Sequence, residues 1–142
     1  MERFVLFLHI LGSVAMGFYL LAPFVVAQLN RIEGDAKNGV LSMMRSLNTY
    51  AQLGLVIQLL TGVYLLLQED YSMLWMLLSF VLFVLIGAFG GMMAGPMRRA
   101  LDGIRERREV GSELKKLRVF SALVCVSFVA ILFVMTFERL FA

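Results

Sequence analysis

The chain has 142 residues, of which 61% are hydrophobic and only 16% are charged. A soluble domain carries about 25% charged residues, so this composition excludes an ordinary soluble protein. Four stretches contain no Asp, Glu, Lys or Arg: residues 4–30, 46–68, 71–97 and 119–137. Because about 20 apolar residues cross a bilayer core, each stretch is long enough to span it. Little length remains for a soluble catalytic domain, and we expect one integral membrane domain over 1–142.

These stretches predict an all-α fold, an antiparallel bundle of four transmembrane helices at about 4–28, 48–68, 72–95 and 119–138. The first stretch could instead be a signal peptide. However, Met1-Glu2-Arg3 has no excess of positive side chains, and the apolar run exceeds the roughly 7 to 15 residues of a signal core. We therefore expect the first helix to be retained.

The charges between the helices predict the orientation. Residues 29–46 contain three basic side chains, residues 97–118 contain eight, and the turn between the second and third helices contains only Glu69 and Asp70. Basic loops stay on the cytoplasmic side of a membrane. We thus expect a multi-pass protein of the inner or plasma membrane, with 29–46 and 97–118 cytoplasmic and both termini extracytoplasmic.

The basic segment 97–118 also contains four acidic residues, and Glu109 and Glu113 are spaced to pair with residues one helical turn away. This pattern predicts that helices three and four extend into the cytoplasmic loop. No aromatic residue lies between Met97 and Arg118 to stack on a base. We expect contact with anionic headgroups of the lipid bilayer and no nucleic-acid partner.

Helix three carries Gly87, Gly91 and Gly95 at intervals of four residues. Such a ridge of small residues lets another backbone approach closely. It predicts tight helix packing within the bundle or between protomers, and hence a homo-oligomer, for example a dimer. Pro96 follows directly and is expected to end or kink the helix.

Helices one and two each present a face of small and weakly polar residues, and we expect these two faces to pack together. They are Val5, His9, Gly12, Ser13, Met16 and Gly17 on helix one, and Ala51, Gly54, Gln58, Thr61 and Gly62 on helix two.

His9 is the only histidine, and at 1.5 Å per residue it lies on the order of 9 Å inside the outer membrane surface. At a similar depth we expect a polar layer of Ser13, Gln58, Thr61 and Ser79, with Met76 and Met135 nearby. An ionisable residue facing a bundle interior is a candidate functional site. Three roles remain open: a neutral imidazole bonded to Thr61, Ser13 or a carbonyl; a ligand of haem b or copper with Met76 or Met135; or part of a proton or solute path.

Two segments carry a family resemblance: Phe-Leu-His-Ile-Leu-Gly-Ser at 7–13, followed by Gly17 and Pro23, and Gln-Leu-Leu-Thr-Gly-Val-Tyr-Leu-Leu-Leu at 58–67. They resemble small predicted integral membrane proteins related to the copper-resistance protein CopD and to HemJ-type protoporphyrinogen oxidases. The resemblance covers roughly the first half of the chain. Members of that group carry a histidine in the first helix, which matches His9, and the resemblance implies a link to haem or copper.

The chain departs from the HemJ-type pattern, which has a tryptophan after the helix-one histidine, a proline followed by arginine, and a lysine in a later helix. This chain has Met16 in place of that tryptophan, Phe24 follows Pro23, and no span contains lysine. We therefore assign no catalytic residue and favour a non-enzymatic CopD-like role in transport, assembly or envelope homeostasis. The alternatives are a haem- or copper-binding redox protein and a proton or solute channel or transporter.

Overall fold

The computed structural model describes residues 1–141, and these fold entirely into helices and short connections. The elements are α1 (Glu2–Ala15), α2 (Phe18–Leu29), α3 (Asp35–Leu66), α4 (Met73–Arg105), α5 (Gly111–Thr136) and a short 3-10 helix, η1 (Glu138–Phe141). Four helical segments are long and apolar enough to cross a membrane, with α1 and α2 together forming the first. The predicted all-α class and the four helical spans are confirmed.

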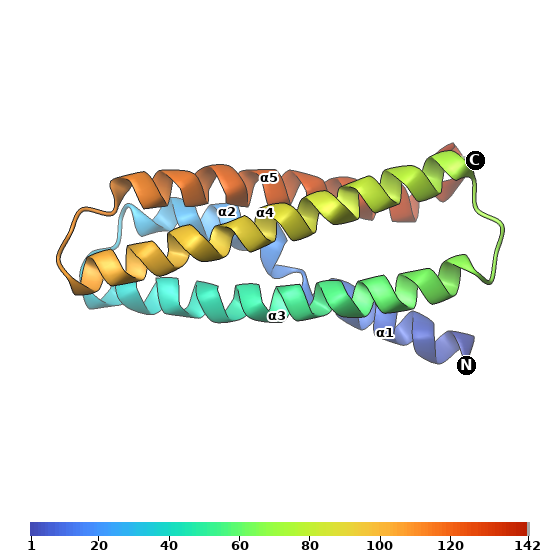
Figure 1. Ribbon diagram of the computed structural model, residues 1–142, viewed down its shortest axis with the longest axis horizontal. Helices are drawn as coiled ribbons and strands as arrows, with labels where there is room; N and C mark the ends of the chain where they lie inside the picture. The colour runs from blue at the N-terminus through green and yellow to red at the C-terminus, as the bar shows by residue number, and fades with distance from the viewer. Residues whose placement is uncertain (142) are drawn as a thin grey trace.

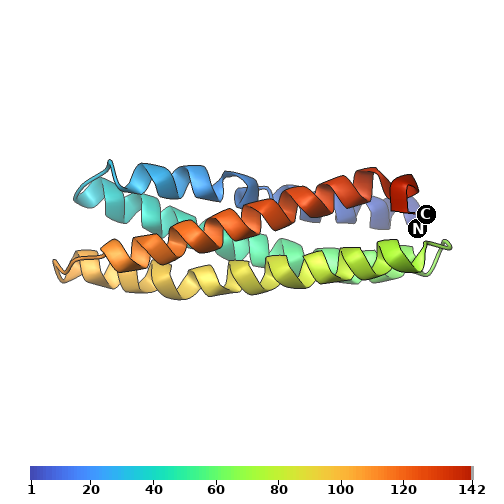
Figure 2. The same ribbon diagram turned by 90° about the horizontal axis from the view of Figure 1, so that it is seen from above.

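The helices form an elongated bundle with both termini at one end (Figure 1). The α3–α4 connection lies at this same end, and the α2–α3 and α4–α5 connections lie at the other, as both views show (Figure 2). α1 packs on α3, α2 packs mainly on α5, and α4 packs on both α5 and α3. The first span therefore changes its main partner along its length.

That change of partner coincides with a break that the sequence analysis did not predict. The expected continuous helix at 4–28 is divided at Met16 and Gly17. The backbone there tightens, since Gly17 N–H donates to Val14 O at 3.0 Å and Tyr19 N–H donates to Met16 O at 2.9 Å. A Cβ atom on residue 17 would lie 2.9 Å from Val14 O, so the tight turn requires glycine.

Two other helix boundaries also differ from the predictions. α3 begins at Asp35, so residues 35–46 are helical and only 30–34 connect the first two spans. α4 does not end at Pro96 but continues to Arg105, and α5 begins at Gly111. The expected helix end at Pro96 is therefore wrong, whereas the predicted extension of both helices into 97–118 is present. Proline removes one backbone hydrogen bond, but Met93, Met97 and Ala100 around it are fully buried, and this packing holds the helix together.

The two ends of the bundle are packed differently. Fully buried apolar side chains gather in the half away from the termini and include Leu29, Leu41, Met44, Met93, Met97 and Leu117.

Large apolar side chains such as Leu60, Phe80 and Val126 cover the outside of the bundle. A continuous exposed apolar surface of this kind suits contact with lipid.

Candidate functional site

A cavity of about 390 Å³ lies between α1, α3, α4 and α5 in the half of the bundle that carries the termini. Its walls are mainly aliphatic and aromatic, with a few polar groups. Of the residues singled out from the sequence, it brings together His9, Ser13, Gln58, Met76, Ser79 and Met135. Residues from four separate segments that were matched only by depth thus line one cavity.

His9 on α1 is held by Thr61 on α3. Its Nδ1 atom lies 2.9 Å from Thr61 Oγ1, and the Thr61 hydroxyl lies 2.7 Å from the carbonyl oxygen of Ile57 one turn earlier. Thr61 is buried behind the cavity wall, whereas His9 lines the cavity. The hydrogen bond with Thr61, one of the three roles considered for His9, is present.

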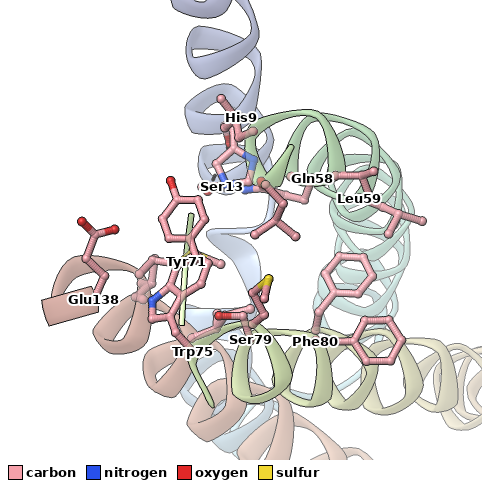
Figure 3. A pocket seen from close by; sticks show the side chains of 18 of the residues that line it. His9, Ser13, Gln58, Leu59, Tyr71, Trp75, Ser79, Phe80 and Glu138 are labelled. Atoms are coloured by element: carbon pink, nitrogen blue, oxygen red, sulfur yellow. Dashed lines mark hydrogen bonds between the residues drawn. The ribbon is translucent and has the colours of Figure 1, made fainter. Parts of the chain in front are cut away.

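Ser13 and Gln58 form a second bridge between α1 and α3. The Gln58 side-chain Nε2 donates to Ser13 Oγ, and Ser13 Oγ–H donates to His9 O at 3.2 Å. Figure 3 shows His9, Ser13 and Gln58 on one side of the cavity. They form its polar wall.

The opposite wall comes from α4 and α5. Trp75 is buried, and its Nε1–H donates to Val134 O on α5 at 2.9 Å. Ser79 lies one turn further along α4 and faces the polar wall across the cavity (Figure 3). Because Trp75 is the only tryptophan in the chain, it is a built-in spectroscopic reporter for this cavity.

Tyr71 and Glu138 line the cavity at the end where the chain termini lie. The Tyr71 ring stacks on Trp75, with ring centroids 4.5 Å apart. Partial burial raises the pKa of the Tyr71 hydroxyl, and the negative charges of Glu69 and Glu138 raise it further. The Tyr71 hydroxyl thus lies beside an acidic mouth of the cavity formed with Glu138.

The glycine ridge on α4 does not act as one packing surface within the chain. A Cβ on Gly87 would lie 3.0 Å from the Leu55 side chain, but a Cβ on Gly91 would meet nothing within 4 Å, and one on Gly95 only Arg99 of its own helix. The glycine packed most tightly against α2 and α3 is Gly90 instead.

Gly90 belongs to a buried polar cluster that the sequence analysis missed. Asn48 Nδ2 donates to Gly90 O at 3.1 Å, and Gln52 Nε2 donates to the hydroxyl of Tyr19. Tyr19 is fully buried. Asn48 and Gln52, one helical turn apart in a charge-free run, were the available signal for this cluster.

A haem or metal site would rely on few ligands. Within residues 1–141, no group of three or more His, Cys, Asp or Glu side chains is placed to hold a metal ion. The available set is the imidazole of His9 with the thioethers of Met76 and Met135, all lining the cavity. Imidazole and thioether are suitable ligands for copper and for haem iron.

Four long apolar helices around a cavity define a polytopic integral membrane protein. The chain belongs to the family described as "Predicted integral membrane protein (DUF2269)", whose model matches residues 3–139. No curated protein and no solved structure matched the chain in the corresponding comparisons.

Proposed function

We propose that this protein is a non-enzymatic membrane protein of CopD-like type that holds a small, largely apolar molecule in the cavity between α1, α3, α4 and α5. Such binding would serve transport, assembly or envelope homeostasis. The observation that carries the proposal is the cavity itself, of about 390 Å³, with apolar walls and one polar wall built from His9, Ser13 and Gln58. This combination is typical of small-molecule sites, where a few polar groups orient an apolar ligand.

The packing of the rest of the bundle favours a binding site over a proton or solute channel. Beyond the cavity, Tyr19, Met93 and Val124 are fully buried. A continuous water-filled path would have to displace such close-packed side chains. We therefore favour a cavity that is closed off by the rest of the bundle over a continuous channel.

We further infer that the cavity faces the extracytoplasmic side of the cell membrane. Glu69 and Asp70 lie at the end of the bundle that carries the termini and the cavity, whereas the basic residues of 97–118 gather at the other end. Basic residues favour the cytoplasmic side. A cysteine at residue 70 in the Cys125→Ser background should react with an impermeant thiol reagent in intact cells, and a cysteine at Lys115 should not. The opposite labelling would overturn this orientation.

Trp75 provides the binding test. In lipid nanodiscs, a bromoalkane that enters the cavity should quench Trp75 with a saturable dependence on its concentration. Ser79→Phe fills the cavity and should abolish saturation, whereas Leu77→Phe, which lies on the same helix with 60% of its surface exposed, should not. A Trp75→Phe/Leu77→Trp variant reports quenching from the bilayer alone. Quenching of Trp75 that never exceeds this bilayer signal would overturn the proposal.

A second candidate is a haem b- or copper-binding redox protein, favoured by the presence of His9, Met76 and Met135 around one cavity. The bound group would supply one-electron chemistry, and the protein would supply an imidazole and thioethers as ligands. Protein purified after growth with copper or haem should then show bound copper or a Soret band, and His9→Ala should remove it while Cys125→Ser retains it. A signal indifferent to His9→Ala would contradict this role.

We also propose self-association through Gly91 and Gly95 on α4. A Cβ at either position would meet no other helix of the described residues 1–141, and small residues at a lipid-facing surface let a second protomer approach. Gly91→Leu should reduce the mass of the detergent-solubilised particle, whereas Leu77→Ala should leave it unchanged. A particle that is monomeric before and after Gly91→Leu would remove the case for an oligomer.

A further inference from the structure

The directions of the hydrogen bonds around His9 define which of its ring nitrogens is free. The hydroxyl of Thr61 has one proton, and its 2.7 Å approach to Ile57 O is attractive only if that proton lies between the two oxygens. Thr61 Oγ1 must then accept the hydrogen bond from His9 Nδ1–H. In the neutral ring, Nε2 is consequently left with a lone pair and no proton.

The protons of Ser13 and Gln58 can be assigned in the same way. Ser13 uses its proton on His9 O, so its oxygen accepts the bond from Gln58 Nε2. The Gln58 amide is thereby oriented with its nitrogen toward Ser13. Its oxygen, Oε1, is buried and has no hydrogen-bond partner within the described chain. The residues of the polar wall therefore hold two acceptors without a partner in the described chain, His9 Nε2 and the buried Gln58 Oε1.

Ser79 stands on the other side of the cavity. Only 8% of its surface is exposed, and its Oγ has no hydrogen-bond partner in the part of the chain that the structure describes. A buried polar atom without a partner costs about 1–3 kcal/mol, and native proteins satisfy most of them. Both residues line the cavity, so a ligand held there would be a candidate partner for the Ser79 hydroxyl and the Gln58 oxygen.

We propose that the ligand of this cavity is an uncharged amphiphile whose polar head is a hydroxyl group, such as a long-chain alcohol or a phenol. Its O–H would donate to the acceptors of the polar wall, and its oxygen would accept from Ser79. The apolar body would lie among Phe83, Phe128 and Ile131, which line the same cavity. This inference rests on the proposed binding function and adds the chemistry of the ligand.

Other head groups fit this arrangement less well. An ether or ketone oxygen has no proton, so it would leave the acceptors of the polar wall unpaired and bring another lone pair toward them. An ammonium head would need a counter-charge, because burying an isolated ion is costly. The spans contribute no carboxylate to the cavity wall, since Glu138 lies beyond the end of α5.

Three probes that differ only in the head group test the inference: 10-bromodecan-1-ol, its methyl ether and 10-bromodecylammonium. Saturable quenching of Trp75 in nanodiscs gives the affinity of each. The alcohol should bind about tenfold more tightly than the ether, which corresponds to one hydrogen bond to a buried acceptor. Gln58→Leu should reduce this ratio toward one, while the lipid-facing control Leu77→Ala should preserve it.

The outcomes separate the two proposals. Equal binding of alcohol and ether, or tighter binding of the ammonium probe, would overturn the hydroxyl inference and leave the binding function intact. Failure of every probe to show saturable quenching would overturn both. If Gln58→Leu does not fold, Thr61→Val provides the second test, because it frees His9 to carry its proton on Nε2 and should also lower the alcohol-to-ether ratio.

Discussion

Gly12 on α1 and Gly54 on α3 meet backbone to backbone: a Cβ on residue 54 would lie 2.8 Å from Gly12 O, and a Cβ on residue 12 would lie 3.1 Å from Gly54 O. No side chain separates the two helices at this point. The contact lies between the His9–Thr61 bond and the buried Tyr19 cluster, and it brings α1 close enough to α3 for His9 and Ser13 to reach their partners.

Enlarging Gly54 should therefore destabilise the protein. Gly54→Val forces the two backbones apart and should cost about 1–3 kcal/mol, measured as a lower thermal midpoint in detergent. Gly91→Ala is the matched control, because a Cβ there meets nothing within 4 Å and alanine favours the helix. Equal stability of Gly54→Val and the parent protein would contradict the close contact.

Gly90 provides a second packing test, in which both Gly90 and its neighbour Tyr19 can be substituted. A Cβ on Gly90 would collide with the Tyr19 hydroxyl and with Gln52 Nε2. Gly90→Ala should cost about 2 kcal/mol in unfolding free energy. Tyr19→Phe removes the colliding oxygen, so part of this loss should be recovered in the double variant. Strict additivity of the two changes would show that the residues do not interact.

His9 and Thr61 should be coupled in ligand binding. Thr61→Val keeps the shape of the side chain but removes the acceptor for His9 Nδ1–H, and should weaken binding of the bromoalcohol probe about fivefold to tenfold. In the His9→Phe background, Thr61→Val should have little further effect. Independent effects of the two changes would argue against a positioning role of Thr61.

The acidic mouth of the cavity should be visible in the titration of Tyr71. Glu138→Gln removes one of the negative charges that raise its pKa, so the Tyr71 pKa should fall. The titration can be followed by the NMR shift of the Tyr71 ring carbon that bears the hydroxyl. Because the folded protein favours neutral Tyr71, this contribution to stability is present below the unfolded tyrosine pKa of about 10 and is lost as pH rises through the higher folded value. An unchanged Tyr71 pKa in Glu138→Gln would show that the Glu138 carboxylate does not act on Tyr71.

The parts of this architecture that depend on one-dimensional patterns could be predicted from the sequence. Runs without charge locate the spans, and counting residues from their ends places His9 level with Thr61, Gln58 and Ser79. These predictions need only the rise per residue of a helix and the thickness of a membrane. The same count places Met76 and Met135 near that level, but the cavity that they share with His9 appears only in the structure, because depth does not say which way a side chain faces.

Features that depend on helix rotation and on long-range partners could not be predicted from the sequence. Gly87, Gly90, Gly91 and Gly95 look alike as a ridge, and only the rotation of α4 shows that Gly90 faces Tyr19 while Gly91 faces outward. The break at Gly17 has no strong local signature. Its position follows from packing, because α1 and α2 contact different helices.

The break between α1 and α2 also bears on how the protein is assembled. α1 and α2 precede the other helices in chain order, but α2 packs mainly against α5, the last of the four described spans. α1 can pair with α3 as soon as the second span has entered the membrane. α2 has to wait until α5 has been made. Completion of the bundle is thus tied to insertion of the fourth span, and a chain truncated before α5 would expose the α2 surface to quality-control proteases of the membrane.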